Sequence, residues 1–258
     1  MIPYSDSGAP PHTFPVVKVS IIAITTLVFL YELSLGGLGM LFGNAGGELS
    51  AFFFRWGFIP KELTRGRPFT LPVAIRTPAP TEATIFSSMF IHGGFLHFAG
   101  NMMFLWVFGD NVEDRLGHLK FLLFYLVVGV AATLSHLLID PHSQTPLVGA
   151  SGAISGIMGA YLLLYPQNKV KVLVLFYIIT VVEIKAFWLL GLWFLWQLVQ
   201  GVLSVGLSQS VDIAFFAHVG GFAAGAGLMA VYKTFFMRSG DDGPVAKQPW
   251  DYWYRTRR

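Results

Sequence analysis

Residues 149–156 read GASGAISG, and they open an apolar segment that continues to about residue 165. Ser151 stands between Gly149 and Gly152, and glycine permits both a tight turn into a helix and the close approach of a second backbone. The first turn of a helix leaves N–H groups without partners, at the positive end of the helix dipole. A serine there has the surroundings of a nucleophile beside an oxyanion site. The alternative is that Ser151 caps the helix and that Gly152 and Gly156 form a helix-packing motif.

The composition indicates a membrane protein. Hydrophobic residues make up 54% of the 258 residues and charged residues 12%, whereas soluble domains carry about 25% charged residues. Between Lys120 and Lys169 the only charged residue is Asp140, so we expect two spans with a loop between them. The absence of cysteine excludes disulfides and thiolate metal sites. The net charge of +3 is mild and its cations are spread along loops, so we expect no nucleic-acid partner.

We expect an all-α, polytopic membrane protein with six transmembrane helices. The six apolar segments cover about residues 16–36, 94–108, 119–138, 151–165, 186–205 and 213–235. A further apolar stretch, 170–182, is short and bracketed by charged residues, so we interpret it as an interfacial or loop element. The long first loop, about 37–93, contains an aromatic group at residues 52–58 that fits either the membrane interface or a packed loop helix.

The segment that begins at Ser151 is shorter than the others. From Ser151 to Leu164 it extends about 21 Å, whereas the hydrocarbon core is about 30 Å thick. If its far end lies level with the interface, Ser151 lies about 9 Å below the opposite surface, at the end of loop 139–150. Irregular backbone at such a depth is tolerated only where it lines a cavity or is buried in protein.

The distribution of Lys and Arg predicts the orientation of the chain. Cations follow the second and fourth spans and recur in the tail, whereas the loops 139–150 and 206–212 contain none. The positive-inside rule then places both termini in the cytoplasm. Residues 1–15 contain several prolines and are expected to form a disordered or loosely draped cytoplasmic segment. Residues 16–235 are expected to form the membrane domain and 236–258 a cytoplasmic tail.

A histidine stands at the head of the last apolar segment. Histidine inside a span is costly and by default marks a function, and imidazole titrates near neutral pH, which suits a general base. Gly221 and Gly225 follow His218 at i+3 and i+7, so the three share one helix face. Ser151 and Ser155 begin a similar stripe of small residues, and two such stripes let helices pack closely. We therefore expect His218 to lie level with Ser151; the alternative is a histidine that only packs.

The second span contains two residues that can donate hydrogen bonds. His97 and Asn101 are four positions apart and so lie on one helix face. Their N–H groups suit the stabilisation of a developing oxyanion. His92 lies about one turn further out, where we expect a structural or hydrogen-bonding residue. No H-E-x-x-H or H-x-x-E-H pattern accompanies these histidines, so we expect no metal and no cofactor.

Three motifs, each at the head of a span, resemble those of the rhomboid family of intramembrane serine proteases. The pattern H-G-G-x-x-H-x-x-x-N covers residues 92–101, G-x-S-G covers 149–152, and A-H-x-x-G covers 217–221. The likeness extends over about residues 13–235 and implies a rhomboid-like helical bundle. The motifs also contain His92, Gly149, Gly152 and Gly221, which we expect to support the site.

The resemblance implies a role for each reactive residue. Ser151 matches the nucleophile and His218 its general base, in a dyad without a carboxylate partner. The backbone N–H of Ser151 with the side chains of His97 and Asn101 matches the family's oxyanion site.

Two features bear on how the base is held. Neither Asp140 nor Asp212 matches a family position for a third, acidic residue. Some relatives carry a tyrosine four residues after the serine, packed against the histidine, but this chain has Ser155 there. The sequence therefore leaves open which residue positions His218.

The implied function is hydrolysis of peptide bonds in or next to the transmembrane segments of other membrane proteins. Its partners are then transmembrane protein substrates and the lipid bilayer, and the span 186–205, rich in tryptophan, is the expected lateral gate. The implied location is a membrane that the chain crosses several times, the inner or plasma membrane if the chain is bacterial. The sequence specifies no oligomeric state.

Two other functions fit parts of the sequence. A catalytically silent rhomboid-like protein would bind membrane clients without cutting them, although loss of the serine or histidine is its usual mark. A small transporter or channel fits the composition alone, with the histidines as a proton relay.

Overall fold

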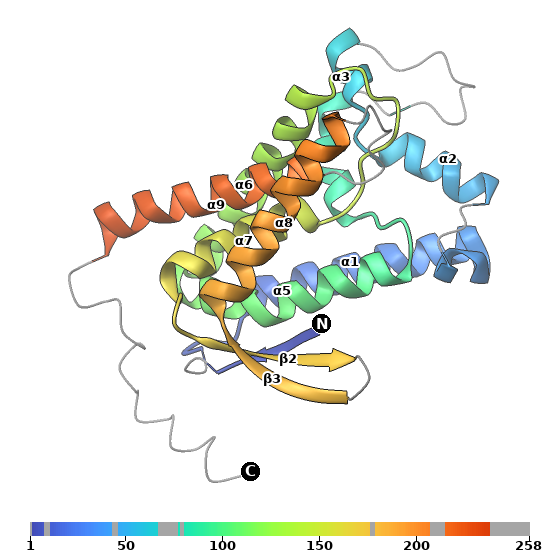
Figure 1. Ribbon diagram of the computed structural model, residues 1–258. Helices are drawn as coiled ribbons and strands as arrows, with labels where there is room; N and C mark the ends of the chain where they lie inside the picture. Colours follow the sequence, from blue (N-terminus) through green and yellow to red (C-terminus); the bar gives the residue numbers. More distant parts are fainter. Residues whose placement is uncertain are drawn as a thin grey trace.

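The computed structural model describes residues 2–7, 11–42, 46–66, 77, 80–175, 179–206 and 215–237. These residues form mostly helices, with a small sheet at one side (Figure 1). The helices are α1 (Val16–Gly36), α2 (Gly47–Trp56), α3 (Pro60–Arg65), α4 (Thr84–Ser87), α5 (Phe95–Leu116), α6 (His118–Ile139), α7 (Ser151–Leu164), α8 (Ala186–Gly206) and α9 (Phe215–Phe236). The 3-10 segments are η1 (Gly37–Phe42), η3 (Thr81–Ala83) and η4 (Ser88–Phe90), and the strands are β1 (Ile2–Asp6), β2 (Lys169–Leu175) and β3 (Ile179–Lys185).

The chain is a polytopic helical membrane protein. Four segments are long and apolar enough to cross a membrane, namely Val16–Leu41, His118–Ile139, Ala186–Ser204 and Phe215–Phe236. The other two predicted spans differ: α7 is apolar but only 14 residues long, and α5 continues past the predicted end near residue 108 into a charged turn that ends at Leu116. The count of six spans therefore stays a prediction.

The short helix α7 lies inside the bundle, where it packs against α5, α6, α8 and α9 (Figure 1). Every residue from Gly152 to Tyr161 is buried. A Cβ on Gly152 would stand 2.6 Å from the Cβ of Ala132 in α6, and one on Gly156 would stand 2.7 Å from the Cβ of Val128. Because protein and not lipid surrounds α7, the helix need not match the thickness of the bilayer.

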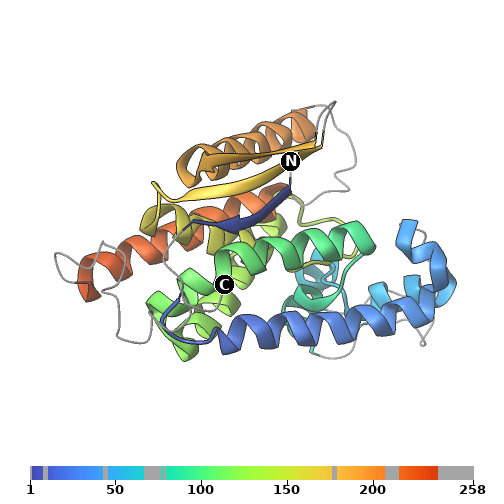
Figure 2. The same ribbon diagram turned by 90° about the horizontal axis from the view of Figure 1, so that it is seen from below.

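The N-terminal residues form a strand instead of a loose segment. β1 pairs antiparallel with β2, with Asp6 opposite Val170 (Figure 2). The Oδ2 atom of Asp6 accepts hydrogen bonds from Asn111 Nδ2, at 2.9 Å, and from the hydroxyl of Tyr161. The expectation of a disordered or loosely draped N-terminus is wrong for residues 2–6, because the ladder and these donors hold them.

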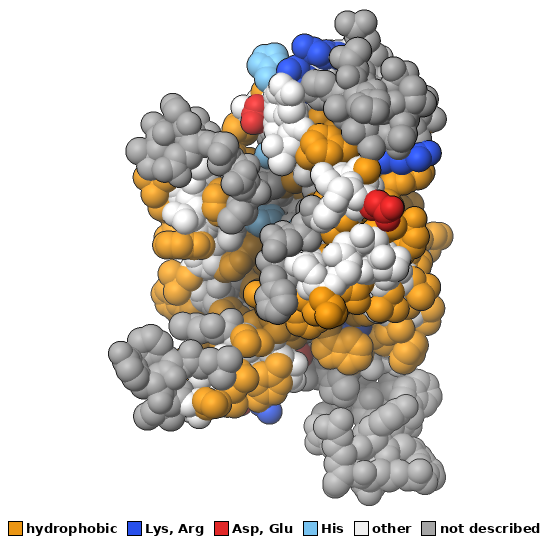
Figure 3. Space-filling model, turned by 90° about the vertical axis from the view of Figure 1, so that its right-hand side faces the viewer, with side chains coloured by type: hydrophobic (Ala, Val, Ile, Leu, Met, Phe, Trp, Pro, Cys, Tyr) orange, Lys and Arg blue, Asp and Glu red, His pale blue; other side chains and the backbone are white. Residues whose placement is uncertain are grey.

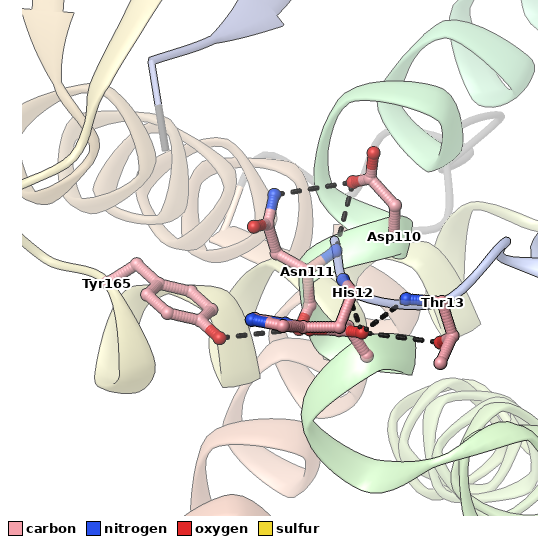
Figure 4. Close-up of polar contacts among 6 residues, drawn as sticks. His12, Thr13, Asp110, Asn111 and Tyr165 are labelled. Carbon is pink, nitrogen blue, oxygen red and sulfur yellow. Dashed lines mark hydrogen bonds and ion pairs between the residues drawn. The ribbon is translucent and has the colours of Figure 1, made fainter. Parts of the chain in front are cut away.

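A polar layer continues from this strand along the end of α5. The backbone N–H groups of His12 and Thr13 donate to Asp114 Oδ1, at 2.9 and 3.1 Å. Beside them Tyr165, just after α7, donates to the backbone oxygen of Asn111 at 3.4 Å (Figure 4). The N-terminal residues, the end of α5 and the end of α7 therefore meet at one side of the bundle, at the end of α7 opposite to Ser151.

The described residues of the stretch 170–182 form β-strands, whereas the sequence analysis expected an interfacial or loop element in place of a span. β2 and β3 pair antiparallel, from Lys169 opposite Lys185 to Leu175 opposite Ile179. Val170 and Val172 are fully buried and alternate with partly exposed residues, whereas β3 is mostly exposed. One face of the hairpin thus covers the bundle next to β1.

The first loop packs on the bundle and supports the loop that precedes α7. Phe58 is fully buried, and its backbone exchanges two hydrogen bonds with Leu147, at 3.0 and 2.7 Å. Phe52 is half-buried in α2 and meets the ring of Tyr31 edge-on, with centroids 5.6 Å apart. Of the two interpretations of the aromatic group at 52–58, these contacts favour the packed loop helix.

Two sequence expectations concern residues that the structure does not describe. Asp212 lies outside the described residues, as does the tail from residue 238 onward.

Candidate active site

Ser151 is the first residue of α7, and the loop that leads to it has a special backbone conformation at Gly149. Gly149 has a φ of 126°, which side chains rarely allow. A Cβ at this position would also stand 2.8 Å from Cε1 and Nε2 of His97. The N–H of Gly149 donates to the backbone oxygen of Ser88 at 2.9 Å, which anchors the turn to the first loop. Glycine is therefore required here both for its dihedral angle and for space beside His97.

The structure brings Ser151 and His218 into direct contact. The Oγ of Ser151 and the Nε2 of His218 are 2.8 Å apart, although the residues are 67 positions apart in the chain. The approach depends on small residues, because Cβ atoms on Gly221 and Gly225 of α9 would overlap the backbone carbonyls of Gly152 and Gly156 of α7. With an unprotonated Nε2, the serine hydroxyl donates to the ring, which is the arrangement of a nucleophile and its base.

The other ring nitrogen of His218 has a partner that the sequence analysis missed. Nδ1 of His218 lies 2.8 Å from Oε1 of Gln197 in α8. Trp193, one turn earlier in α8, lies against the same imidazole, with ring centroids 5.9 Å apart at 39°. The sequence did contain a sign of this contact, because Gln197 follows Trp193 by four residues and so lies on the same face of a mostly apolar helix.

Ser155 does not take the place of the expected partner of the histidine. Its side chain is buried, and its hydroxyl donates to the backbone oxygen of Ser151 at 2.6 Å. The contacts of the His218 ring described here, other than that with Ser151, therefore come from α8 and not from Ser155.

The structure places the predicted oxyanion residues on α5 next to the turn at Gly149. The His97 ring lies against Gly149, as the close approach to a Cβ there indicates. Asn101 is buried, and one N–H of its amide donates to the backbone oxygen of His97 at 2.9 Å. This bond orients the amide one turn below His97 and leaves it a second N–H.

His92 lies behind His97 as a buried, uncharged support. It is fully buried, and its ring meets that of His97 edge-on, with centroids 5.1 Å apart at 65°. Burial and the neighbouring His97 lower the pKa of His92 to about 3, so its ring is neutral near pH 7. Its backbone N–H donates to the carboxylate of the buried Glu32, at 3.1 and 3.3 Å. We interpret His92 as packing that holds His97 and the start of α5.

The site is only partly covered by the described residues and has a small pocket beside it. Ser151 and His218 are half-buried and His97 is exposed. In the space-filling view a histidine surface lies in a hollow (Figure 3). A pocket next to Ser151 is lined largely by small side chains, which include Gly129, Ala132, Gly149, Gly152, Ala153 and Ala217. The described residues thus do not enclose the serine completely, and the pocket suits a small side chain.

Comparisons with known proteins identify a single family. A family model described as the Rhomboid domain matches residues 81–235. RHOMBOID-like protein 5 of Arabidopsis thaliana is 32% identical over 148 residues, which are 55% of this chain and 41% of the plant protein. Rhomboid protease GluP of Bacillus subtilis is 38% identical over 79 residues, which are 31% of this chain and 15% of the bacterial protein.

A mitochondrial relative gives a similar result. Rhomboid protein 1, mitochondrial, of Saccharomyces cerevisiae is 32% identical over 98 residues, which are 36% of this chain and 28% of the yeast protein. The chain thus spans less than half the length of each of these three relatives.

Proposed function

The chain belongs to the rhomboid family, and on that premise we propose that it is a serine endopeptidase that cleaves transmembrane proteins in or next to their membrane-spanning segments. The observation that carries the proposal is the 2.8 Å contact between Ser151 Oγ and His218 Nε2. This contact supports an active enzyme, because the serine hydroxyl and the imidazole have the geometry that proton transfer from nucleophile to base requires. Two relatives named as proteases or putative proteases, GluP and YdcA of Bacillus subtilis, match parts of the chain and support the same activity.

The proposed reaction has two halves. Ser151 Oγ attacks the carbonyl carbon of the scissile bond while its proton passes to His218 Nε2. The tetrahedral intermediate collapses when His218 gives that proton to the leaving nitrogen, which departs as an amine and leaves an ester on Ser151. Water then attacks the ester, again losing a proton to His218, and the acid product leaves as the proton returns to Ser151.

The negative charge of each intermediate needs donors that are already in place. We assign this role to the backbone N–H of Ser151, at the start of α7, and to the side chains of His97 and Asn101. The placement of the His97 ring against Gly149 supports this role, because the turn at Gly149 leads directly to Ser151. The hydrogen bond that orients the Asn101 amide supports it too.

The surroundings of the dyad support a membrane substrate with a small side chain at the cut. Half of the residues that line the pocket beside Ser151 are glycine or alanine. The helix α8 is a reasonable entrance, because its tryptophans Trp188 and Trp196 are 57% and 59% exposed. A helical substrate segment must unwind locally first, since its own hydrogen bonds shield the scissile carbonyl.

The orientation in the membrane is also part of the proposal. We infer that both termini are cytoplasmic and that the site opens toward the opposite side. In support of this, Asp6 of β1 contacts Tyr161, near the end of α7 opposite to Ser151. α9 begins near the serine and packs along α7, so it runs toward the same end.

A fluorophosphonate probe on the protein in detergent or proteoliposomes tests the nucleophile. Wild type should be labelled, Ser151→Ala should not, and the matched variant Ser155→Ala, one turn along the same helix, should keep the label. His218→Ala should lose nearly all labelling and turnover, because removing one residue of a catalytic unit lowers the rate about as much as removing the whole unit.

A cleavage assay on a panel of single-span proteins then separates the enzyme from its alternatives. Fragments produced by wild type and not by Ser151→Ala support the protease. Binding of the same proteins without fragments and without probe labelling would instead identify a silent client-binding protein.

A further inference from the structure

The imidazole of His218 is held at both of its nitrogens. Nε2 contacts Ser151 Oγ and Nδ1 contacts Gln197 Oε1, each at 2.8 Å. A neutral imidazole carries one hydrogen, and Nε2 can take the proton of the serine only if that hydrogen is on Nδ1. Nδ1–H then donates to Oε1 of Gln197. The glutamine oxygen therefore selects the tautomer that can act as a base and prevents rotation of the ring.

Gln197 lies where an unsatisfied amide would be costly. The buried positions of α8 are Ala186, Leu190, Gln197 and Gly201, which recur at helical spacing along one face, and Gln197 is 9% exposed. A buried amide without a hydrogen-bond partner is destabilising. The bond to His218 gives its carbonyl oxygen a partner, so the contact orients both side chains.

The helix that supplies this oxygen is the least enclosed of the four candidate spans. Of the 18 residues that form the apolar part of α8, 17% are buried inside the protein, whereas the corresponding shares are 28% for α9 and 39% for α6. In Figure 1 α8 lies on the outside of α7 and α9. A displacement of α8 away from α9 would break the bond between Gln197 and His218.

We propose that Gln197 is the positioning residue of the dyad, which holds His218 in its basic tautomer through the Nδ1–H to Oε1 hydrogen bond as long as α8 is packed on α9. This rests on the proposed function. In a serine protease with a triad, an aspartate holds the histidine. At this depth a neutral amide supplies the same acceptor without a charge, which would be costly inside a membrane.

Three variants of α8 test the role in catalysis. Gln197→Met keeps the size and removes the acceptor, Gln197→Glu keeps an acceptor, and Gln200→Met is the matched control. Gln200 is a half-buried glutamine of the same helix that makes no side-chain hydrogen bond with the part of the chain that the structure describes. The kcat and KM for a transmembrane reporter are measured in proteoliposomes, with thermal unfolding as a check on folding.

We expect Gln197→Met to lower kcat at least tenfold. The loss should not exceed the whole contribution of a general base, which is about 10²–10⁴. KM should stay within about twofold of the wild-type value. Gln197→Glu keeps an acceptor but places a carboxyl group in the membrane, so its kcat should lie between those of Gln197→Met and wild type. Gln200→Met should match wild type. A wild-type kcat in a folded Gln197→Met, or an equal loss in Gln200→Met, would overturn the role of Gln197.

A second readout does not depend on activity. In protein with 15N-labelled histidine, the His218 signals, assigned by their loss in His218→Ala, report which ring nitrogen carries the hydrogen. We expect the Nδ1–H tautomer in wild type and a mixed or Nε2–H population in Gln197→Met. An unchanged tautomer in Gln197→Met refutes the positioning role. Absence of probe labelling in wild type refutes the protease instead, so the two failures are distinguishable.

Discussion

The backbone carbonyl of Gly152 lies directly against Gly221, with no room for a side chain between α7 and α9. One turn further along, Gly156 and Gly225 repeat this contact. Ser151 precedes the first of these contacts by one residue and His218 precedes it by three. The backbone contact of the two helices therefore sets the 2.8 Å distance between the reactive atoms of Ser151 and His218.

A side chain at the second contact should separate the helices. We expect Gly225→Ala to lower the free energy of unfolding by about 1–3 kcal/mol, as overpacking does, and to reduce cleavage although residue 225 does not touch the dyad. The matched control is Gly227→Ala in the same helix, where a Cβ would meet nothing within 4 Å. Thermal unfolding in detergent and probe labelling measure both effects. Equal melting temperatures for the two variants would contradict the prediction.

The turn before Ser151 should not tolerate a side chain either. Gly149→Ala meets a positive φ and a ring atom of His97 at 2.8 Å, so it strains the backbone by about 1–2 kcal/mol and moves His97. We expect kcat to fall by about 10²–10³, as for loss of an oxyanion donor. Gly100→Ala, on α5 between the two proposed donors and with open space around its Cβ, is the control. If Gly149→Ala retains full activity, His97 does not act from this position.

Glu113 should contribute to stability from outside the site. Its buried carboxylate accepts the N–H groups of Val17 and Lys18 at 2.9 and 2.7 Å, and so caps the first turn of α1 from α5. We expect Glu113→Ala to cost at least about 2 kcal/mol, because it leaves these donors unsatisfied. Glu113→Gln keeps an acceptor and should lose less, and Glu82→Ala, an exposed glutamate, should be neutral. Chemical unfolding in mixed micelles would show the order, and an equal loss in all three would refute the cap.

The attachment of β1 should weaken as the pH rises. Burial and the nearby Asp110 raise the pKa of Asp6, although its hydrogen bonds with Tyr161 and Asn111 oppose this. With a pKa above its unfolded value of 3.8, folded Asp6 binds more protons than unfolded Asp6, so stability declines from about pH 4 upward until the folded group has ionised.

Asp6→Asn should remove this contribution. The melting temperature of the variant relative to wild type should therefore increase between about pH 4 and pH 7, because only wild type has a carboxyl group at position 6 that ionises over this range. Melting curves of both proteins in the same buffers measure the difference. A difference that stays constant over this range would show that folding does not raise the pKa of Asp6.

The sequence predicted the elements that depend on local composition. α1 begins and ends at the expected residues and α7 begins at Ser151, because long apolar runs and glycine next to polar residues mark where helices start in a membrane. The strand β1 was missed because its hydrogen-bond partners are distant in the chain: Asp6 and Tyr161 are 155 positions apart. No local pattern in a short segment with prolines indicates such pairing.

By itself the sequence determined which residues carry reactive groups and that they stand at the heads of helices in a membrane protein of the rhomboid family. Only the tertiary structure decided what lies against the second nitrogen of the His218 ring. α8 is apolar around most of its circumference, so its hydrophobic pattern does not specify which face turns inward. The packing of α8 on α9 sets that rotation, and it brings Gln197 to Nδ1 of His218.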